Sequence, residues 1–392
     1  MEKKEDIKKL KGLKTPNKYI IKSLSDYINK LSMFKDNKYY FRGESKYYND
    51  ILSSGLRIDD IDYRKKPEFQ RMIKKYYIEV GQRISEIDRR AFTAFSQHHG
   101  IPTNLIDIST SPLISLYFAC ENDLDDNGFV YLINRRNTIE ITERIHHINQ
   151  IYINIFDIIA SDKKEDIIKN FEMFCELFID NKELFIYLFG ILIDEYTYYD
   201  NFISLEKKRI SFLKKASKGF EEKQISMFFD HTKDDEKDRI KNEINKIQKR
   251  YEEKLDDFIE KETNYEVELR IESYEEKLIY IYYFMSKGFI DFIKEYGEFI
   301  PWVNFLPIFT YNPVTDFQRI KNQEGLFIHQ GYQVGHDKVY DMSVFARQRI
   351  WPDKVFVIEN KRKILQELDM LGFNEKYIFF DFDSIAKYIK NN

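Results

Sequence analysis

Cysteine is scarce in this chain of 392 residues, which contains only Cys120 and Cys175. The two lie far apart in the sequence and each falls inside an apolar segment, so neither a disulfide framework nor a cysteine-rich metal site is expected. A reducing, cytoplasmic setting fits this cysteine usage best, because disulfides persist mainly in oxidising compartments.

Charge of one sign is not in large excess either. The 62 basic and 66 acidic residues give a formal net charge of -4 at pH 7. This balance excludes a global positive field that would recruit nucleic acid or an anionic membrane. Nucleic acid is therefore expected as a partner only through a local basic patch.

Long apolar runs are also lacking. The most hydrophobic stretch, ELFIYLFGILIDE at residues 183–195, is bounded by acidic residues, whereas a membrane span needs about 20 largely apolar residues in succession. We interpret it as a buried helix and expect no membrane partner. The N-terminal MEKKEDIKKLKGLK is rich in charge and lacks the apolar core of a signal peptide.

Glycine and proline almost vanish between residues 136 and 300, where apolar residues such as Ile240 and Ile244 recur at helical spacing. We expect an all-helical insertion over 136–300, serving either as a scaffold or as a partner-binding arm. Residues 18–135 and 301–392 mix helices with short strands. The predicted fold is α+β: a domain with a small mixed sheet, built from both chain ends and interrupted by the insertion.

Two details of this organisation are also predicted. Residues 68–97 carry a continuous helical pattern and are expected to form one long helix. The C-terminal YIFFDFD, residues 377–383, is rich in aromatic residues and is expected to be a strand that follows a helix.

The segment YYFRGES, residues 39–45, is an apolar strand that ends in Arg42 and Gly43. A guanidinium at this place is suited to a bidentate hold on a phosphate or carboxylate. The absent side chain of Gly43 would let a ligand approach the backbone. The alternative is an internal salt bridge from Arg42 to an acidic neighbour such as Glu44 or Asp107.

The segment IDISTSPLISLYFA, residues 106–119, predicts the start of a helix. Pro112 fits the first helical position and the hydroxyl of Ser111 fits the cap. This leaves the hydroxyls of Ser109 and Thr110 beside a helix N-terminus, a place that favours phosphate oxygens and ribose hydroxyls.

Two neighbouring histidines, His98 and His99, match no zinc spacing, so no metal is expected. One of them, or Gln97, is a candidate for lining a pocket, and Asp107 is a candidate carboxylate or a turn cap.

Glu324 lies in NQEGLF, beside Gln323 and before an apolar strand. A carboxylate that shares a cleft with Arg42 would hydrogen-bond a ribose hydroxyl and stabilise an oxocarbenium-like transition state. The alternative is a solvated glutamate at a strand edge.

These segments together resemble the FRG domain, a bacterial domain named for its (F/Y)RG motif. The resemblance rests on FRGES at 41–45, QHHGIPTNLIDISTSPLISLYFA at 97–119, RIKNQEGLFI at 319–328 and KILQELDMLGFNEKYIFFDFDSIAKYI at 363–389. It implies an α+β domain and a setting in bacterial defence or mobile-element neighbourhoods.

The order of Arg42, a Ser-Thr-Ser segment and Glu324 is also similar, more distantly, to the arginine, serine, glutamate type of ADP-ribosyltransferase. That similarity implies NAD as substrate, with Arg42 holding its phosphate and ribose, Ser109 ordering the nicotinamide ribose and Glu324 polarising a ribose hydroxyl. The candidate catalytic residues are therefore Arg42, Ser109 and Glu324, and the candidate NAD-binding residues are Arg42, Gly43, His98, Ser109, Thr110 and Gln323.

The expected function is thus a cytoplasmic effector of anti-phage defence or toxin type that uses NAD to transfer ADP-ribose. The alternative is a non-enzymatic sensor or adaptor that binds a nucleotide or a phage component and presents its helical insertion to a protein partner.

Overall fold

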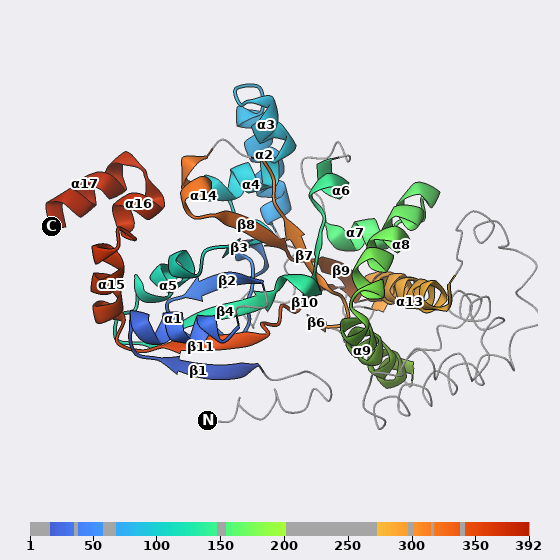
Figure 1. The fold of residues 1–392 in the computed structure, drawn as a ribbon. Helices are drawn as coiled ribbons and strands as arrows, with labels where there is room; N and C mark the ends of the chain where they lie inside the picture. Colours follow the sequence, from blue (N-terminus) through green and yellow to red (C-terminus); the bar gives the residue numbers. More distant parts are fainter. Residues whose placement is uncertain are drawn as a thin grey trace, which may run out of the picture. The chain divides into compact units, whose positions relative to one another are not determined.

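The computed structural model describes residues 16–34, 38–57, 68–146, 154–200, 273–296, 302–314, 317–337 and 342–391. The chain divides into two compact units, whose elements Figure 1 labels. We call residues 14–154, 308–331 and 347–392 the sheet unit, and residues 1–13, 155–307 and 332–346 the helical unit. The predicted insertion, 136–300, differs from the helical unit because 136–154 belong to the sheet unit and 332–346 to the helical unit.

The sheet unit contains a mixed, open sheet in the order β1-β11-β4-β2-β3-β8-β7-β5. The edge pairs, β1 with β11 and β5 with β7, are parallel, and the inner pairs are antiparallel. Strands from both ends of the chain are neighbours in this sheet, and the predicted α+β class is confirmed. The strands are β1 (Asn17–Ile21), β2 (Tyr39–Glu44), β3 (Leu105–Ser109), β4 (Gly128–Asn134), β5 (Thr138–Glu140), β7 (Ile308–Tyr311), β8 (Gly325–His329) and β11 (Lys354–Ile358).

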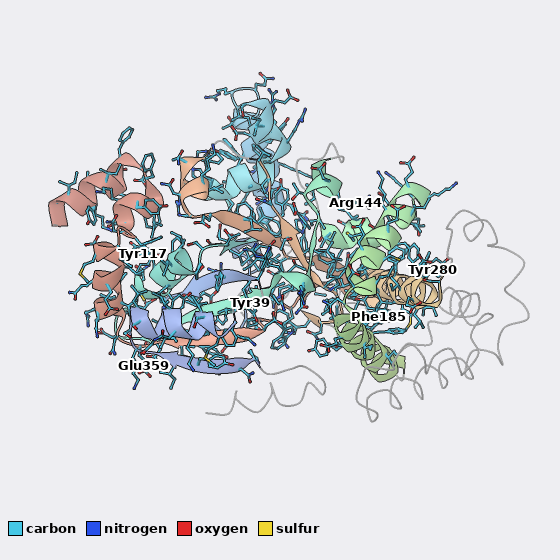
Figure 2. All side chains as sticks on the ribbon, viewed as in Figure 1. Tyr39, Tyr117, Arg144, Phe185, Tyr280 and Glu359 are labelled. Carbon is cyan, nitrogen blue, oxygen red and sulfur yellow. The ribbon has the colours of Figure 1, made fainter. Side chains whose placement is uncertain are left out.

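Both faces of this sheet are covered, because alternate residues of each strand point to opposite sides. One face carries Phe41, Leu132 and Phe356 in a buried cluster with Tyr39 and Tyr117, the last two labelled in Figure 2. The other face carries a second buried cluster. The helices of the unit are α1 (Leu24–Ser32), α2 (Phe69–Val80), α3 (Glu86–Arg90), α4 (Phe92–His98), α5 (Pro112–Cys120), α6 (Thr142–His146), α14 (Gln318–Asn322), α15 (Lys361–Met370), α16 (Glu375–Phe379) and α17 (Phe382–Asn391), with short 3-10 turns at Ser54–Leu56 and Arg135–Asn137.

Two predicted elements are wrong. The expected long helix over 68–97 is three helices, because α2 ends at Gly81 and the Ser85 side chain caps a new helix by accepting from the backbone N–H of Asp88. The expected strand at 377–383 is the end of α16 and the start of α17. Asn374 caps α16, and a left-handed residue, Phe380, ends it.

The helical unit is built from α7 (Ile155–Ile159), α8 (Lys164–Ile179), α9 (Lys182–Asp200) and α13 (Tyr274–Tyr296), with a small sheet of β6 (Trp302–Val303), β10 (Met342–Gln348) and β9 (Tyr332–Asp337). The apolar run at 183–195 lies in α9, where Phe185, labelled in Figure 2, is fully buried, so the predicted buried helix is confirmed. The expected repeat around Ile240 and Ile244 lies outside the described residues.

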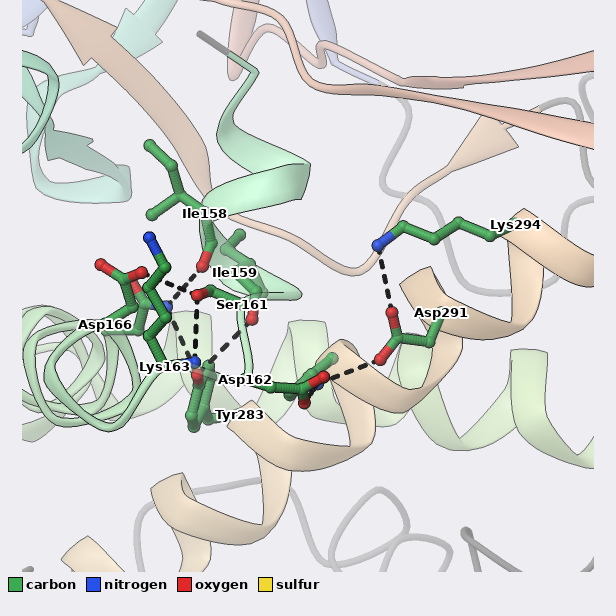
Figure 3. Close-up of polar contacts among 11 residues, drawn as sticks. Ile158, Ile159, Ser161, Asp162, Lys163, Asp166, Tyr283, Asp291 and Lys294 are labelled. Carbon is green, nitrogen blue, oxygen red and sulfur yellow. Dashed lines mark hydrogen bonds and ion pairs between the residues drawn. The ribbon is translucent and has the colours of Figure 1, made fainter. Parts of the chain in front are cut away.

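Polar contacts attach α13 to neighbouring loops of this unit. The hydroxyl of Tyr282 is buried among phenylalanine rings and donates to the carbonyl of Phe305. Lys287 donates to Asp162 and to Asp291 at 2.7 and 3.0 Å. Asp291 also accepts from Lys294 at 3.2 Å, as Figure 3 shows. In the described part of the chain, no helix is both long and apolar enough to cross a membrane.

Candidate functional site

The sheet unit contains a cavity of about 240 Å³. Its walls come from β2, β3 and β8 and from the helices α4, α5 and α14. Aromatic and aliphatic side chains form much of the lining, which is typical of small-molecule sites. The polar residues that line it are Arg42, Gln97, His98, Asp107, Ser109, Ser115, Arg319 and Gln323.

The cavity lies where two neighbouring strands separate. β2 pairs with β4 at six positions, but with β3 at only one, Phe41 opposite Ser109. Beyond this pair the ladder is not continued, and Gly43 and Asp107 both line the cavity. The gap in the ladder leaves backbone groups that a side chain must satisfy.

Arg42 supplies that contact. Its Nη1 donates to the backbone carbonyl of Asp107 at 2.8 Å and its Nε donates to Glu44 Oε1 at 2.9 Å. The pair is buried, with side-chain exposures of 13% and 5%. Among the described residues Nη2 has no partner. The guanidinium is therefore fixed by an internal ion pair and still retains one nitrogen for a ligand.

Gly43 is required for packing against α5. A Cβ at this position would lie 1.9 Å from the carbonyl oxygen of Ser115 and 2.8 Å from the backbone nitrogen of Ala119. Backbone atoms of a helix cannot move aside as a flexible side chain can. The absence of a side chain at 43 therefore admits α5 to the sheet, whatever it does for a ligand.

The hydroxyl of Ser109 is engaged within the protein. It donates to the carbonyl of Gln323 at 2.6 Å and accepts from the backbone N–H of Ser111 at 2.9 Å. Pro112 is the first residue of α5 as predicted, but the predicted capping bond from Ser111 is wrong, since its side chain makes none. Ser109 thus joins the end of β3 to the turn before β8.

Glu324 and Thr110 are not among the lining residues of the cavity. Thr110 donates through Oγ1 to Glu324 Oε2 at 2.9 Å, and its backbone N–H donates to the Glu324 carbonyl at 3.1 Å. Glu324 is exposed and has a left-handed backbone, with φ of 45°. The cavity brings Arg42 and Ser109 together, and its lining includes a different carboxylate.

That carboxylate is Asp107. Its Oδ1 accepts from Gln97 Nε2 at 2.9 Å, and Gln97 in turn accepts from the hydroxyl of Thr103. Asp107 is exposed, and its Oδ2 has no partner among the residues that the structure describes. The chain from Thr103 through Gln97 orients one oxygen and leaves the other for a ligand.

His98 contributes a neutral ring. It stacks on Phe317 with ring centroids 3.9 Å apart and planes at 20°. Burial, together with the neighbouring His99 and Arg319, lowers the pKa of His98 to about 4. At pH 7 the imidazole is therefore uncharged and can both donate and accept a hydrogen bond.

Arg319 is a lining residue that the sequence did not single out as a site residue, although it opens the segment RIKNQEGLFI. It lies on α14, which rests on α16: Asn322 Nδ2 donates to the carbonyl of Tyr377 at 2.8 Å, and Gln323 Nε2 to that of Ile378 at 3.3 Å. Gln323 therefore faces the cavity with its amide nitrogen already in use. A basic residue four positions before Gln323 was the available signal.

In the described ranges, no group of three or more His, Cys, Asp or Glu side chains is placed so that it could hold a metal ion.

The sheet unit is thus an α+β domain whose strands part around a cavity bearing two arginines. Residues 37–128 match the FRG domain family, so the chain contains an FRG domain. The match spans β2, α4, β3 and α5, which form most of the cavity wall. No curated protein and no solved structure matches the chain.

Proposed function

We propose that the FRG domain binds NAD in this cavity and transfers its ADP-ribose to an acceptor. One observation carries the proposal: Arg42 and Asp107 line the same cavity, and each keeps a hydrogen-bonding atom without a partner among the described residues. Arg42 Nη2 would hold a phosphate oxygen, and Asp107 Oδ2 would accept from a ribose hydroxyl.

The reaction needs a carboxylate beside the sugar. When the bond between ribose C1′ and the nicotinamide nitrogen breaks, its electron pair leaves with nicotinamide and the positive charge moves to the sugar. A fixed carboxylate stabilises that charge more than it stabilises the ground state. The acceptor then forms a new bond to C1′, and its proton passes to solvent water.

The cavity volume supports binding of one end of the dinucleotide. Its 240 Å³ lies just below the range of about 300–1,000 Å³ that is common for ligand pockets. Phe41, Phe118 and Phe327 line it and offer apolar contact to a planar ring. We assign the nicotinamide ribose end to the cavity and leave the adenosine outside it.

A second candidate is a sensor without catalytic activity. It would bind a nucleotide or a phage component in the cavity and contact a protein partner through the helical unit. It is favoured by the engagement of Ser109 with Gln323 and of Glu324 with Thr110. Both candidates belong to the defence or toxin setting that the FRG resemblance implies.

Nicotinamide release from NAD, with cell lysate supplied as acceptor and trigger, tests the proposal. We expect Asp107→Asn, which keeps the bond from Gln97, to lower release at least about 100-fold, as loss of a transition-state contact does. Glu324→Gln and the exposed control Asp125→Asn should stay within about threefold. Release that Glu324→Gln abolishes and Asp107→Asn spares would refute the assignment of Asp107. NAD binding by calorimetry without release would favour the sensor, and absence of NAD binding would reject the proposal that the cavity is an NAD site.

A further inference from the structure

Arg319 is a cation without a direct ion-pair partner among the described residues. Its guanidinium lies over the ring of Phe379, 4.8 Å from the centroid. Among the residues that the structure describes, it forms no ion pair and donates no hydrogen bond. Five N–H donors are therefore available on a residue that lines the cavity.

Asp381 and Glu121 interact electrostatically with Arg319, but among the described residues neither forms an ion pair or a hydrogen bond with it. Asp381 accepts from Ser384 through both carboxylate oxygens, at 2.7 Å from the backbone N–H and 2.9 Å from the hydroxyl. Burial raises the pKa of Glu121 to about 7, so this carboxyl is only partly ionised at neutral pH. Neither carboxyl is bonded to the guanidinium, so the N–H donors of Arg319 stay available to a ligand.

Arg319 is also held in place. The α14 helix that carries it is tied to α16 through Asn322 and Gln323, and its guanidinium is stacked on a ring. A side chain fixed before binding loses little conformational entropy when the ligand arrives. Arg42 is fixed in the same sense by Glu44 and Asp107.

We infer that Arg42 and Arg319 together form a diphosphate site, in which each arginine holds a different phosphate group and Arg319 selects diphosphate ligands over monophosphates. One arginine suffices for a single phosphate, whereas two on the wall of one small cavity match two linked phosphates. The inference deepens the proposed function and rests on it for the identity of NAD as ligand.

Isothermal titration of the full chain tests the inference with three probes: ADP-ribose, nicotinamide mononucleotide and inorganic pyrophosphate. Arg319→Met keeps an unbranched side chain at this position without the charge, and Arg319→Lys keeps the charge. Arg362→Met is the matched control, because Arg362 is 66% exposed and lies outside the cavity lining.

We expect Arg319→Met to weaken ADP-ribose and pyrophosphate binding by about 10- to 100-fold and mononucleotide binding by less than about threefold. Arg319→Lys should lose less, and Arg362→Met should bind like wild type. Equal losses for the mononucleotide and ADP-ribose, or no loss for either, would overturn the diphosphate site while leaving NAD binding intact. Pyrophosphate binding that depends on Arg319, without any binding of ADP-ribose or the mononucleotide, would support the site and reject NAD. If the wild type binds none of the three probes, the diphosphate site and the proposal of NAD binding are both overturned.

Discussion

The buried ion pair between Arg42 and Glu44 gives the sharpest prediction about stability. Their side chains are 13% and 5% exposed and meet at 2.9 Å. Removing one partner leaves the other charge buried without compensation, which costs about 3–5 kcal/mol. We therefore expect Arg42→Met to lower the free energy of unfolding of the sheet unit by about that amount.

A double-mutant cycle separates the pair from the individual side chains. Glu44→Gln keeps an oxygen that accepts from Arg42 Nε and should cost less, about 1–3 kcal/mol. The double variant removes both charges, so it should be more stable than the sum of the single losses predicts, by about 0.5–3 kcal/mol. The exposed pair Arg71 and Glu68, 65% and 58% exposed, is the control and should contribute less than about 1 kcal/mol.

Urea unfolding is monitored by hydrogen exchange in peptides from β2 and β4. These peptides report on the sheet unit separately from the helical unit. A loss below about 1 kcal/mol for Arg42→Met, with additive effects in the cycle, would refute the reasoning, since the pair would then behave as a solvated one. The outcome also decides which substitution suits functional work, because a variant that unfolds says nothing about ligand binding.

Three further predictions concern the same unit. Gly43→Ala should lower the melting temperature markedly, because its Cβ would lie 1.9 Å from a backbone oxygen. Gly325→Ala is the control: its Cβ would lie 3.4 Å from the nearest atom, so it should cost less than about 1 kcal/mol. Equal shifts of the melting temperature for the two variants in a thermal scan would contradict this prediction. Lys361→Met removes the ammonium that donates to three backbone carbonyls, and it should lower the free energy of unfolding by about 3 kcal/mol. The exposed Lys363→Met is the control and should lower it by less than about 0.5 kcal/mol. Urea unfolding measures both losses. Burial lowers the pKa of His98 from 6.5 to about 4, so the folded state binds fewer protons than the unfolded state, and stability is lost as pH falls from about 6.5 towards 4. His98→Gln should flatten that dependence, and an imidazole that titrates above pH 6 by NMR would contradict it.

The choice between Asp107 and Glu324 illustrates what a sequence leaves open. Asp107 lies within an apolar strand and Glu324 just before one, and both belong to segments that resemble the FRG domain. Residue type and spacing give no reason to prefer either of them as the carboxylate of the cavity. Glu324 is bonded to Thr110, whereas Asp107 lines the cavity, and these contacts depend on the pairing of β3 with β8.

Ser109 and Ser111 make the same point for hydroxyl groups. Local pattern placed the start of α5 correctly at Pro112, because a proline needs no backbone donor in the first turn. The local pattern could not show which hydroxyl forms which hydrogen bond. The acceptor of Ser109 is the carbonyl of Gln323, more than two hundred residues further along the chain.

The sequence by itself determined the features that depend on near neighbours: the α+β class, the β2 strand, the start of α5 and the burial of the apolar run in α9. These follow from periodicity, backbone propensity and apolar content, which act over a few residues. Only the tertiary structure decided the strand order, the parting of β2 from β3 and the meeting of Arg42, Asp107 and Arg319 around one cavity. Those features arise from hydrogen bonds and packing between segments far apart in the chain, and such partners are fixed only when the whole sheet assembles.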